Sequence, residues 1–234
     1  MPKPLIIAHR GDSSRALENS LEALRLALAI PVDMIEIDLR KSSDNAIYVM
    51  HDKNTGRTAE YDLDIEHSTS KQICDVKLKN GEAIPTLDDV LKLVDGKARL
   101  NLEIKSSGAG EITARRLLAS GYKGYVLISS FHEEEVVAAR SVMPEIPGSL
   151  IFDLLSPRGV PAYKAKGYRI ASISRKAASE KLILACRKHG IKTYLWTVDT
   201  ESEMKKFIAC GVDGIYSNKP LVLKKVVESL RNRA

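Results

Sequence analysis

IIAHRG, residues 6–11, is a short apolar run that ends in an imidazole and a guanidinium, those of His9 and Arg10. In parallel barrels the active site lies at the carboxyl ends of the strands, so a polar residue that ends an apolar run is a site candidate. Three other runs end in the same way, with the pairs Glu36 and Asp38, His51 and Asp52, and Glu103 and Lys105. The sequence therefore predicts one composite site built from several strand ends.

Around this run, strand-like segments alternate with amphipathic helical segments along the whole chain. Such alternation predicts a parallel sheet with helical crossovers. The expected strands are residues 5–9, 34–39, 99–105, 125–131, 148–152, 169–174, 193–198 and 214–217. The expected helices are residues 21–29, 87–94, 111–120, 133–142, 161–166, 179–189, 201–209 and 221–234. Strands that are each followed by a helix, in this number, predict an α/β fold closed into a (β/α)8 TIM barrel.

The chain length fits one barrel better than two small domains, because its 234 residues are close to the roughly 250 of a typical (β/α)8 barrel. We therefore expect a single domain over residues 1–234. The longest stretch without clear periodicity is residues 52–83. We expect an excursion there, between the second and third strands, as a small lid or as an inert loop with a helical turn near residues 70–76.

Composition and cysteine usage indicate the environment of the protein. Hydrophobic residues make up 44% of the chain and charged residues 28%, and no apolar run approaches the roughly 18 residues of a membrane span. The amino terminus shows no leader pattern. The cysteines, Cys74, Cys186 and Cys210, have no CxxC or histidine pattern that would indicate a disulfide framework or a zinc site. We expect a cytoplasmic protein with no stable membrane insertion.

The formal net charge of +6 raises the question of a nucleic-acid or membrane partner. Such partners are attracted by clustered Lys and Arg, and here these residues are mostly dispersed. The exception is residues 221–234, where Lys224, Lys225, Arg231 and Arg233 stand among apolar residues at helical spacing. This pattern is typical of a final barrel helix with cations near its carboxyl end. We expect a small-molecule substrate and no nucleic-acid partner, and the oligomeric state stays open.

Glu36 and Asp38 alternate on a strand, so both side chains point to the same face. Two adjacent carboxylates repel each other unless a positive group joins them. A hard divalent cation such as Mg²⁺ or Ca²⁺ does this through oxygen ligands, and Glu103 on the next expected strand supplies a third carboxylate. The alternative is a pair of salt bridges to Arg40 and Lys105. We favour the metal, because ordinary ion pairs do not explain the flanking histidines.

His9 and His51 have ordinary pKa values near neutrality, so one can deprotonate a nucleophile while the other protonates a leaving oxygen. Arg10 adds a planar fork suited to phosphate oxygens, and Lys105 shares a face with Glu103. These cations together need an anion. The remaining histidines lack such neighbours and are expected to be structural: His67, His132 and His189.

The order and spacing of the short motifs resemble those of glycerophosphodiester phosphodiesterases over essentially the whole chain. The matching motifs are His9-Arg10-Gly11, Glu18-Asn19-Ser20, Glu36-Ile37-Asp38, His51-Asp52, Pro85-Thr86-Leu87, Glu103-Ile104-Lys105, Ser130-Phe131, Trp196-Thr197-Val198-Asp199, Gly211-Val212-Asp213-Gly214 and Ser217-Asn218-Lys219-Pro220. The resemblance implies a (β/α)8 barrel, a divalent cation, and hydrolysis of glycerophosphodiesters to glycerol 3-phosphate and an alcohol.

The resemblance also implies a role for each matching residue. The implied metal ligands are Glu36, Asp38 and Glu103, and the implied acid and base are His9 and His51. The implied substrate contacts are Arg10 and Lys105 for the phosphate, Glu18 and Asn19 for the surrounding polar shell, and Trp196 for the glycerol carbons.

The chain departs from the usual family pattern at three positions. Leu17 and Ser20 stand where family members usually have Pro and Thr around the Glu-Asn pair. The Ser hydroxyl can still cap a helix. Asn218 stands two residues before Pro220, where the family usually has Asp, so we expect no charge there.

Other enzyme and binding classes remain as alternatives. The nearest is a related phospholipase-type barrel that forms a cyclic phosphate, which would be expected to carry an apolar rim that the sequence does not show. A phosphosugar isomerase barrel would not need three carboxylates. A non-catalytic phosphate-binding barrel would not need the complete set of histidines and carboxylates. The nucleophile, either the glycerol 2-hydroxyl or water, is open.

Overall fold

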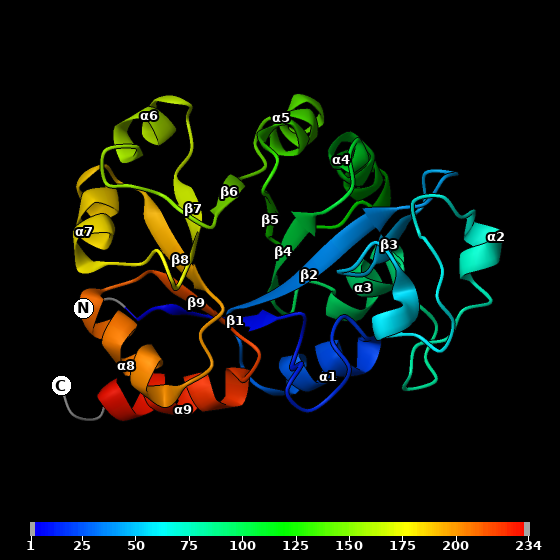
Figure 1. The fold of residues 1–234 in the computed structure, drawn as a ribbon, viewed down its shortest axis with the longest axis horizontal. Helices are drawn as coiled ribbons and strands as arrows, with labels where there is room; N and C mark the ends of the chain where they lie inside the picture. The colour runs from blue at the N-terminus through cyan, green and yellow to red at the C-terminus, as the bar shows by residue number, and fades with distance from the viewer. Residues whose placement is uncertain (1–2, 232–234) are drawn as a thin grey trace.

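The structure is a computed structural model that describes residues 3–231 of the chain. Eight strands of the described residues run parallel in a closed barrel (Figure 1). They are β1 (Leu5–His9), β2 (Met34–Lys41), β4 (Arg99–Ile104), β5 (Val126–Ser130), β6 (Gly148–Phe152), β7 (Ile170–Ser174), β8 (Lys192–Trp196) and β9 (Gly214–Ser217). The order around the barrel is β1-β9-β8-β7-β6-β5-β4-β2, and the pairing of β1 with β2 closes it. The predicted (β/α)8 barrel is confirmed.

Helices follow the parallel strands and surround the barrel in Figure 1. They are α1 (Leu21–Ala29), α3 (Leu87–Val94), α4 (Ala109–Ser120), α5 (Glu133–Val142), α6 (Val160–Ala165), α7 (Glu180–Lys188), α8 (Glu201–Cys210) and α9 (Pro220–Arg231). The expected last helix, 221–234, corresponds to α9, and its residues 232–234, including Arg233, lie outside the described residues, as do residues 1–2. No helix within residues 3–231 is long and apolar enough to cross a membrane.

The two faces of each strand serve different purposes, because side chains alternate along a strand. On β2 the outward side chains of Ile35, Ile37 and Leu39 are fully buried in the layer between strands and helices. The inward side chains begin with Met34, which joins an apolar cluster with Ile7. Two residues further along β2, the inward positions begin to hold polar side chains. The amino-terminal part of the barrel interior is therefore apolar packing, and the chemistry lies toward the carboxyl ends.

A short antiparallel strand, β3 (Ile47–Val49), extends β2 into a hairpin, with Leu39 opposite Val49. Sequence analysis did not include it among the expected strands. Beyond it, the expected excursion carries a short 3₁₀ helix, η1 (Thr55–Arg57), and a single-turn helix, α2 (Ser70–Ile73), where a helical turn was expected.

The excursion has an apolar cluster of its own and lies to one side of the barrel, beside β2 and β3 (Figure 1). Its buried members are Tyr48, Met50, Ala59, Ile65, Ile73, Val76, Leu78 and Ile84. Because these side chains exclude water together, the segment is packed. Whether it is a small lid or an inert segment stays open.

Candidate active site

The polar inward side chains of neighbouring strands meet at the carboxyl end of the barrel. In the strand register, His9 of β1 lies beside Glu36 of β2, and Asp38 of β2 lies beside Glu103 of β4. They surround a cavity of about 150 Å³. Of the predicted site residues, those that line this cavity are His9, Arg10, Glu36, His51, Glu103, Lys105 and Trp196. The other three, Glu18, Asn19 and Asp38, contact the lining residues or one another, as described below.

The predicted carboxylates form a buried cluster. Glu36 is 2% exposed and Asp38 is fully buried, and Glu36, Asp38 and Glu103 each offer an oxygen within 4.8 Å of the others. Glu36 Oε1 and Asp38 Oδ1 have no hydrogen-bond partner within the described part of the chain. Buried acceptors without a partner are costly, so these oxygens call for a ligand that residues 3–231 do not supply. Three carboxylates with oxygens this close together, two of them with an oxygen that has no partner, fit a hard divalent cation.

The charges in this cluster oppose one another when no cation is bound. Burial, and then the neighbouring charge of Asp38, raises the pKa of Glu36 well above its usual range. The same two causes raise the pKa of Glu103 to about 7. Burial also acts to raise the pKa of Asp38, but Arg10 and Lys105 outweigh it and hold the pKa of Asp38 below its usual value. The cation-free cluster therefore holds protons that a metal would displace.

The salt-bridge alternative is only partly realised. Lys105 Nζ donates to Glu103 Oε1 at 2.7 Å and lies 3.8 Å from Asp38 Oδ1. Arg40, the other expected partner, instead donates from Nε to the backbone oxygen of His51 at 2.8 Å and pairs with Glu66. Arg40 thus supports the loop that carries His51 and leaves the carboxylate cluster without a second ion pair of the expected kind.

A sharp backbone turn after β1 places Arg10. Its φ of 58° is in the left-handed region, and Gly11 follows with φ 81°. A Cβ at Gly11 would lie 2.7 Å from the backbone carbon of Ala23, so only glycine fits there. The turn brings the Arg10 amide to within 2.9 Å of Glu36 Oε2, to which it donates.

The Arg10 guanidinium lies between two carboxylates. Nη1 donates to Glu18 Oε1 at 2.8 Å. Nε lies 3.0 Å from Asp38 Oδ2, although its hydrogen does not point at that oxygen, so we treat this contact as an ion pair only. Asn19, also at positive φ, donates from Nδ2 to Asp38 Oδ2 at 2.8 Å. Glu18 and Asn19 are therefore close to the carboxylate cluster and Arg10, and their role as a polar shell around the substrate stays a prediction.

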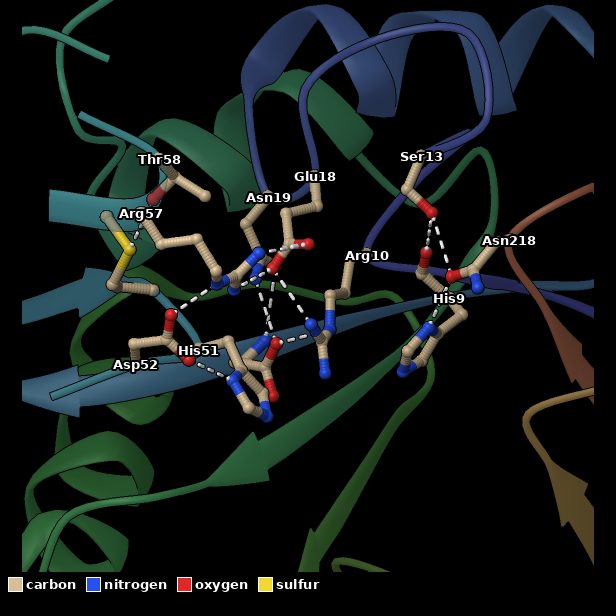
Figure 2. Close-up of polar contacts among 12 residues, drawn as sticks. His9, Arg10, Ser13, Glu18, Asn19, His51, Asp52, Arg57, Thr58 and Asn218 are labelled. Carbon is tan, nitrogen blue, oxygen red and sulfur yellow. Dashed lines mark hydrogen bonds and ion pairs between the residues drawn. The ribbon is translucent and has the colours of Figure 1, made fainter. Parts of the chain in front are cut away.

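His9 is held by residues from the far end of the chain (Figure 2). Its Nδ1 is 2.7 Å from Asn218 Oδ1, and Asn218 is fixed in turn by donating from Nδ2 to Asp199 Oδ2 at 2.7 Å. Ser13 Oγ donates to the same Asn218 oxygen at 3.0 Å. Since an amide oxygen only accepts, this network assigns the proton to His9 Nδ1 and leaves Nε2 as an acceptor. Burial, and then Arg10, lowers the pKa of His9 to about 4.

His51 has a charged partner instead. It follows β3, and its Nδ1 lies 2.6 Å from Asp52 Oδ1. Burial lowers the pKa of His51, while Asp38 and Asp52 act against that shift. The two histidines therefore differ in kind: His9 is backed by a neutral amide and His51 by a carboxylate.

Part of the cavity lining is apolar. Phe131 and Trp196 pack edge to face with ring centroids 5.7 Å apart, and Ile151 lies on the same cavity. Lys105 Nζ is 5.6 Å from the centre of the Phe131 ring. A lining that is polar in part and apolar in part suits a small ligand with an anionic end and a carbon backbone.

Sequence reasoning missed several residues that complete the site. Asn218 and Asp199 were in matching motifs but received no role. The contact of Asn218 with His9 spans 209 positions, and Asp199 acts only through Asn218, so nothing local reveals either residue. Arg57, which contacts both Asp52 and Glu18, lies in the excursion and carried no signal of its own. Tyr216 and Asn101, hydrogen-bonded to each other at 3.2 Å, also line the cavity.

Comparison with known proteins places this site in a family. Residues 9–222 match the profile of the Glycerophosphoryl diester phosphodiesterase family. The chain belongs to this family. A glycerophosphodiester phosphodiesterase of Caldanaerobacter subterraneus is 31% identical, over 96% of this chain and 98% of that protein. A putative glycerophosphodiester phosphodiesterase of Bacillus subtilis is 30% identical, over 92% and 94%. The resemblance found in the sequence is confirmed, and so is the predicted enzyme class, a phosphoric diester hydrolase.

Solved structures of phosphodiesterases share the fold. A glycerophosphodiester phosphodiesterase from Agrobacterium tumefaciens superposes with a TM-score of 0.83 at 26% identity, covering 96% of this chain and 99% of that one. A phosphodiesterase from Oleispira antarctica, in complex with the product sn-glycerol-3-phosphate, superposes with a TM-score of 0.89 at 24% identity, covering 96% and 97%. At that identity the second likeness speaks for the fold alone.

Proposed function

We propose that this family member hydrolyses glycerophosphodiesters to glycerol 3-phosphate and an alcohol, with a divalent cation and two histidines. The observation that carries the proposal is the meeting of three carboxylates, two of them buried and one partly buried, with two histidines and Arg10 at one cavity that is apolar in part. The fold and the family support the reaction class.

Glu36, Asp38 and Glu103 would hold the cation, which we propose to be Mg²⁺ or Ca²⁺ because all the donors are carboxylate oxygens. When bound, such an ion neutralises phosphate charge that would otherwise repel an attacking oxygen. Arg10 and Lys105 border the same cavity and bind the remaining phosphate oxygens. Trp196 and Phe131 pack against the glycerol carbons.

The different partners of the histidines suggest how protons move. His9 Nε2 is an acceptor because Asn218 accepts the hydrogen bond from the protonated Nδ1. The low pKa of His9 keeps the imidazole ring neutral. It takes the proton of the attacking oxygen. His51 has Asp52 beside Nδ1, and a carboxylate stabilises a cationic imidazole. It gives a proton to the oxygen of the departing alcohol, so acid and base roles follow from the two environments.

The attacking oxygen is either the glycerol 2-hydroxyl, which would give a cyclic phosphate that water then opens, or water itself. The related phospholipase-type reading differs from ours mainly in substrate. It gains one observation from the structure: Phe131 is 43% exposed, and Leu154, in the loop that follows β6, is 82% exposed. These are two exposed apolar side chains beyond strand ends, where the sequence had not shown an apolar rim, so a lysophospholipid belongs among the substrates tested.

The test is a product-resolved assay on glycerophosphocholine, glycerophosphoethanolamine and a lysophospholipid, with Mg²⁺ or Ca²⁺ and with excess EDTA. We expect glycerol 3-phosphate and the free alcohol from the first two, and loss of turnover in EDTA that either cation reverses. Phosphate left on the alcohol instead, or activity untouched by EDTA, would contradict the proposal. An analogue without the 2-hydroxyl separates the nucleophiles, because it is inert only if that hydroxyl attacks.

A further inference from the structure

Arg57 forms a bridge between the two halves of the site (Figure 2). Its Nε donates to Asp52 Oδ2, while Asp52 Oδ1 contacts His51 Nδ1 at 2.6 Å. Its Nη1 and Nη2 donate to Glu18 Oε2 and Oε1 at 2.9 and 2.7 Å. Glu18 Oε1 also receives the Arg10 Nη1 bond at 2.8 Å. Each of the two carboxylates thus contacts Arg57 and one residue of the cavity.

This arrangement differs from an ordinary surface ion pair. Arg57 is about half exposed, and isolated pairs at that exposure contribute little to stability. Here, however, three donors of one planar group engage two carboxylates, which is the use for which a guanidinium is suited and an ammonium is not. Burial opposes the shift, but the bonds to Arg57 and His51 hold the pKa of Asp52 at about 2. Asp52 is therefore a fixed anion beside His51.

The backbone that presents Arg57 is itself fixed. Lys79 Nζ donates to the Arg57 carbonyl at 2.8 Å, and the Gly56 amide donates to Asp62 Oδ1 at 2.9 Å. The next residue, Thr58, is buried and donates from Oγ1 to Met50 Sδ at 3.2 Å. Met50 belongs to the apolar cluster of the excursion. These contacts therefore fix the backbone of η1 so that the Arg57 side chain extends toward the barrel.

We propose that Arg57 is a positioning residue for catalysis: it holds Asp52 against His51 and Glu18 against Arg10, so that the proton-transferring group and the phosphate-binding group keep a fixed separation. This inference rests on the proposed function, because it assigns Arg57 to the same site. It also gives residues 52–83 a function, because this packed excursion carries Arg57 and places its guanidinium at the site. Arg57 touches neither substrate nor reacting atoms, and it acts only through the two carboxylates.

The test compares Arg57→Ala and Arg57→Lys with a matched control, Arg116→Gln. Arg116 makes a two-donor pair with Asp88 between α4 and α3 at similar exposure, away from the cavity. We expect both Arg57 variants to lose between about tenfold and about a hundredfold in kcat, because small misplacements of reacting groups have effects of that size. KM should rise as well, through Arg10. Arg116→Gln should keep both constants, and all three proteins should melt within about 4 °C of the parent.

Two further readouts separate positioning from general loss of structure. Added guanidinium, far below unfolding concentrations, should restore part of the kcat of Arg57→Ala and leave Arg57→Lys unchanged, because the lysine fills the vacated position. The imidazole NMR signals of His51 should shift in both Arg57 variants. Those of His67, which is paired with Asp64 in the same excursion at 2.8 Å, should stay in place.

Each outcome decides the inference. An active parent whose Arg57 variants keep its kcat, KM and His51 signals would overturn it. Full activity of Arg57→Lys alone would also overturn it, because charge rather than the fork would then suffice. An inactive parent would refute the proposed function instead, and the His51 signals, which need no substrate, would still decide whether Arg57 orders that histidine.

Discussion

At the scale of single residues, the hydrogen-bond partners of His9 and His51 distinguish the chemistry of the two imidazole rings. The structure gives His9 a neutral acceptor, Asn218, where the family usually has a carboxylate. The hydrogen bond to Asn218 favours the protonated ring, but burial, and then Arg10, outweigh it and lower the pKa of His9 to about 4. A carboxylate at position 218 would favour the protonated ring more strongly than this amide does, which has a consequence for pH dependence.

Asn218→Asp should raise the pKa of His9, because a carboxylate stabilises the protonated ring. The base would then become protonated at higher pH, so the acidic limb of kcat/KM should move upward by about one pH unit or more. Asn218→Ala, which removes the acceptor, should instead lower kcat without moving the limb upward. The measurement is a pH profile of kcat/KM for the three proteins. An acidic limb that stays in place in Asn218→Asp would speak against His9 as the base.

At the scale of elements, the hairpin and excursion show what sequence patterns reveal and what they hide. The barrel strands were predictable because they are apolar runs that alternate with amphipathic helical segments. β3 was not, since it spans only Ile47–Val49 and pairs antiparallel to β2 outside that alternation. The excursion lacks periodicity because its apolar cluster is built from single residues in many separate turns. Such residues need no helical or strand repeat in order to pack together.

Ile65 tests whether the excursion is a packed unit. It is fully buried in the excursion cluster, so Ile65→Ala should lower the free energy of unfolding by about 2–5 kcal/mol. Tyr61→Ala is the matched control in the same segment, where the side chain is largely exposed, and it should change stability by less than about 0.5 kcal/mol. Chemical denaturation measures both. Equal stability of the two variants would show that the cluster contributes nothing to the fold.

At the scale of the whole molecule, the barrel explains which site residues the sequence could reveal. Residues that end strands were predictable, because closure brings all carboxyl ends to one face: His9, Glu36, Asp38, Glu103 and Lys105 are of this kind. Arg57, Asp199 and Asn218 were not, because their value comes from contacts across the closed barrel and the excursion. The cytoplasmic location stays a prediction, and the oligomeric state stays open.

The stability of the whole chain should depend on the cation in a pH-dependent way. The pKa of Glu103 is raised from 4.5 to about 7 in the cation-free fold, so below pH 7 a cation must displace its proton. The increase in Tm produced by Mg²⁺ or Ca²⁺ should therefore be larger at pH 8 than at pH 6. The lowered pKa of His9 makes the cation-free protein more stable as the pH rises, whereas the raised pKa of Glu103 makes it less stable. Only the increase in Tm that the cation produces therefore reports on Glu103.

Thermal unfolding at matched ionic strength measures this increment, with Glu103→Gln as the control. That variant should bind the cation more weakly and lose the part of the pH dependence that comes from Glu103. An increment in the parent that is the same at pH 6 and pH 8 would show that the metal does not displace a proton from Glu103.

The contact of His9 with Asn218 ties the first strand to the last, since β1 pairs with both β2 and β9. During synthesis His9 is made long before Asn218. A growing chain therefore has neither a closed barrel nor an oriented His9 until β9 has been added. Phosphodiester cleavage is thereby postponed until β9 has been made, and fragments that end before β9 are expected to be inert.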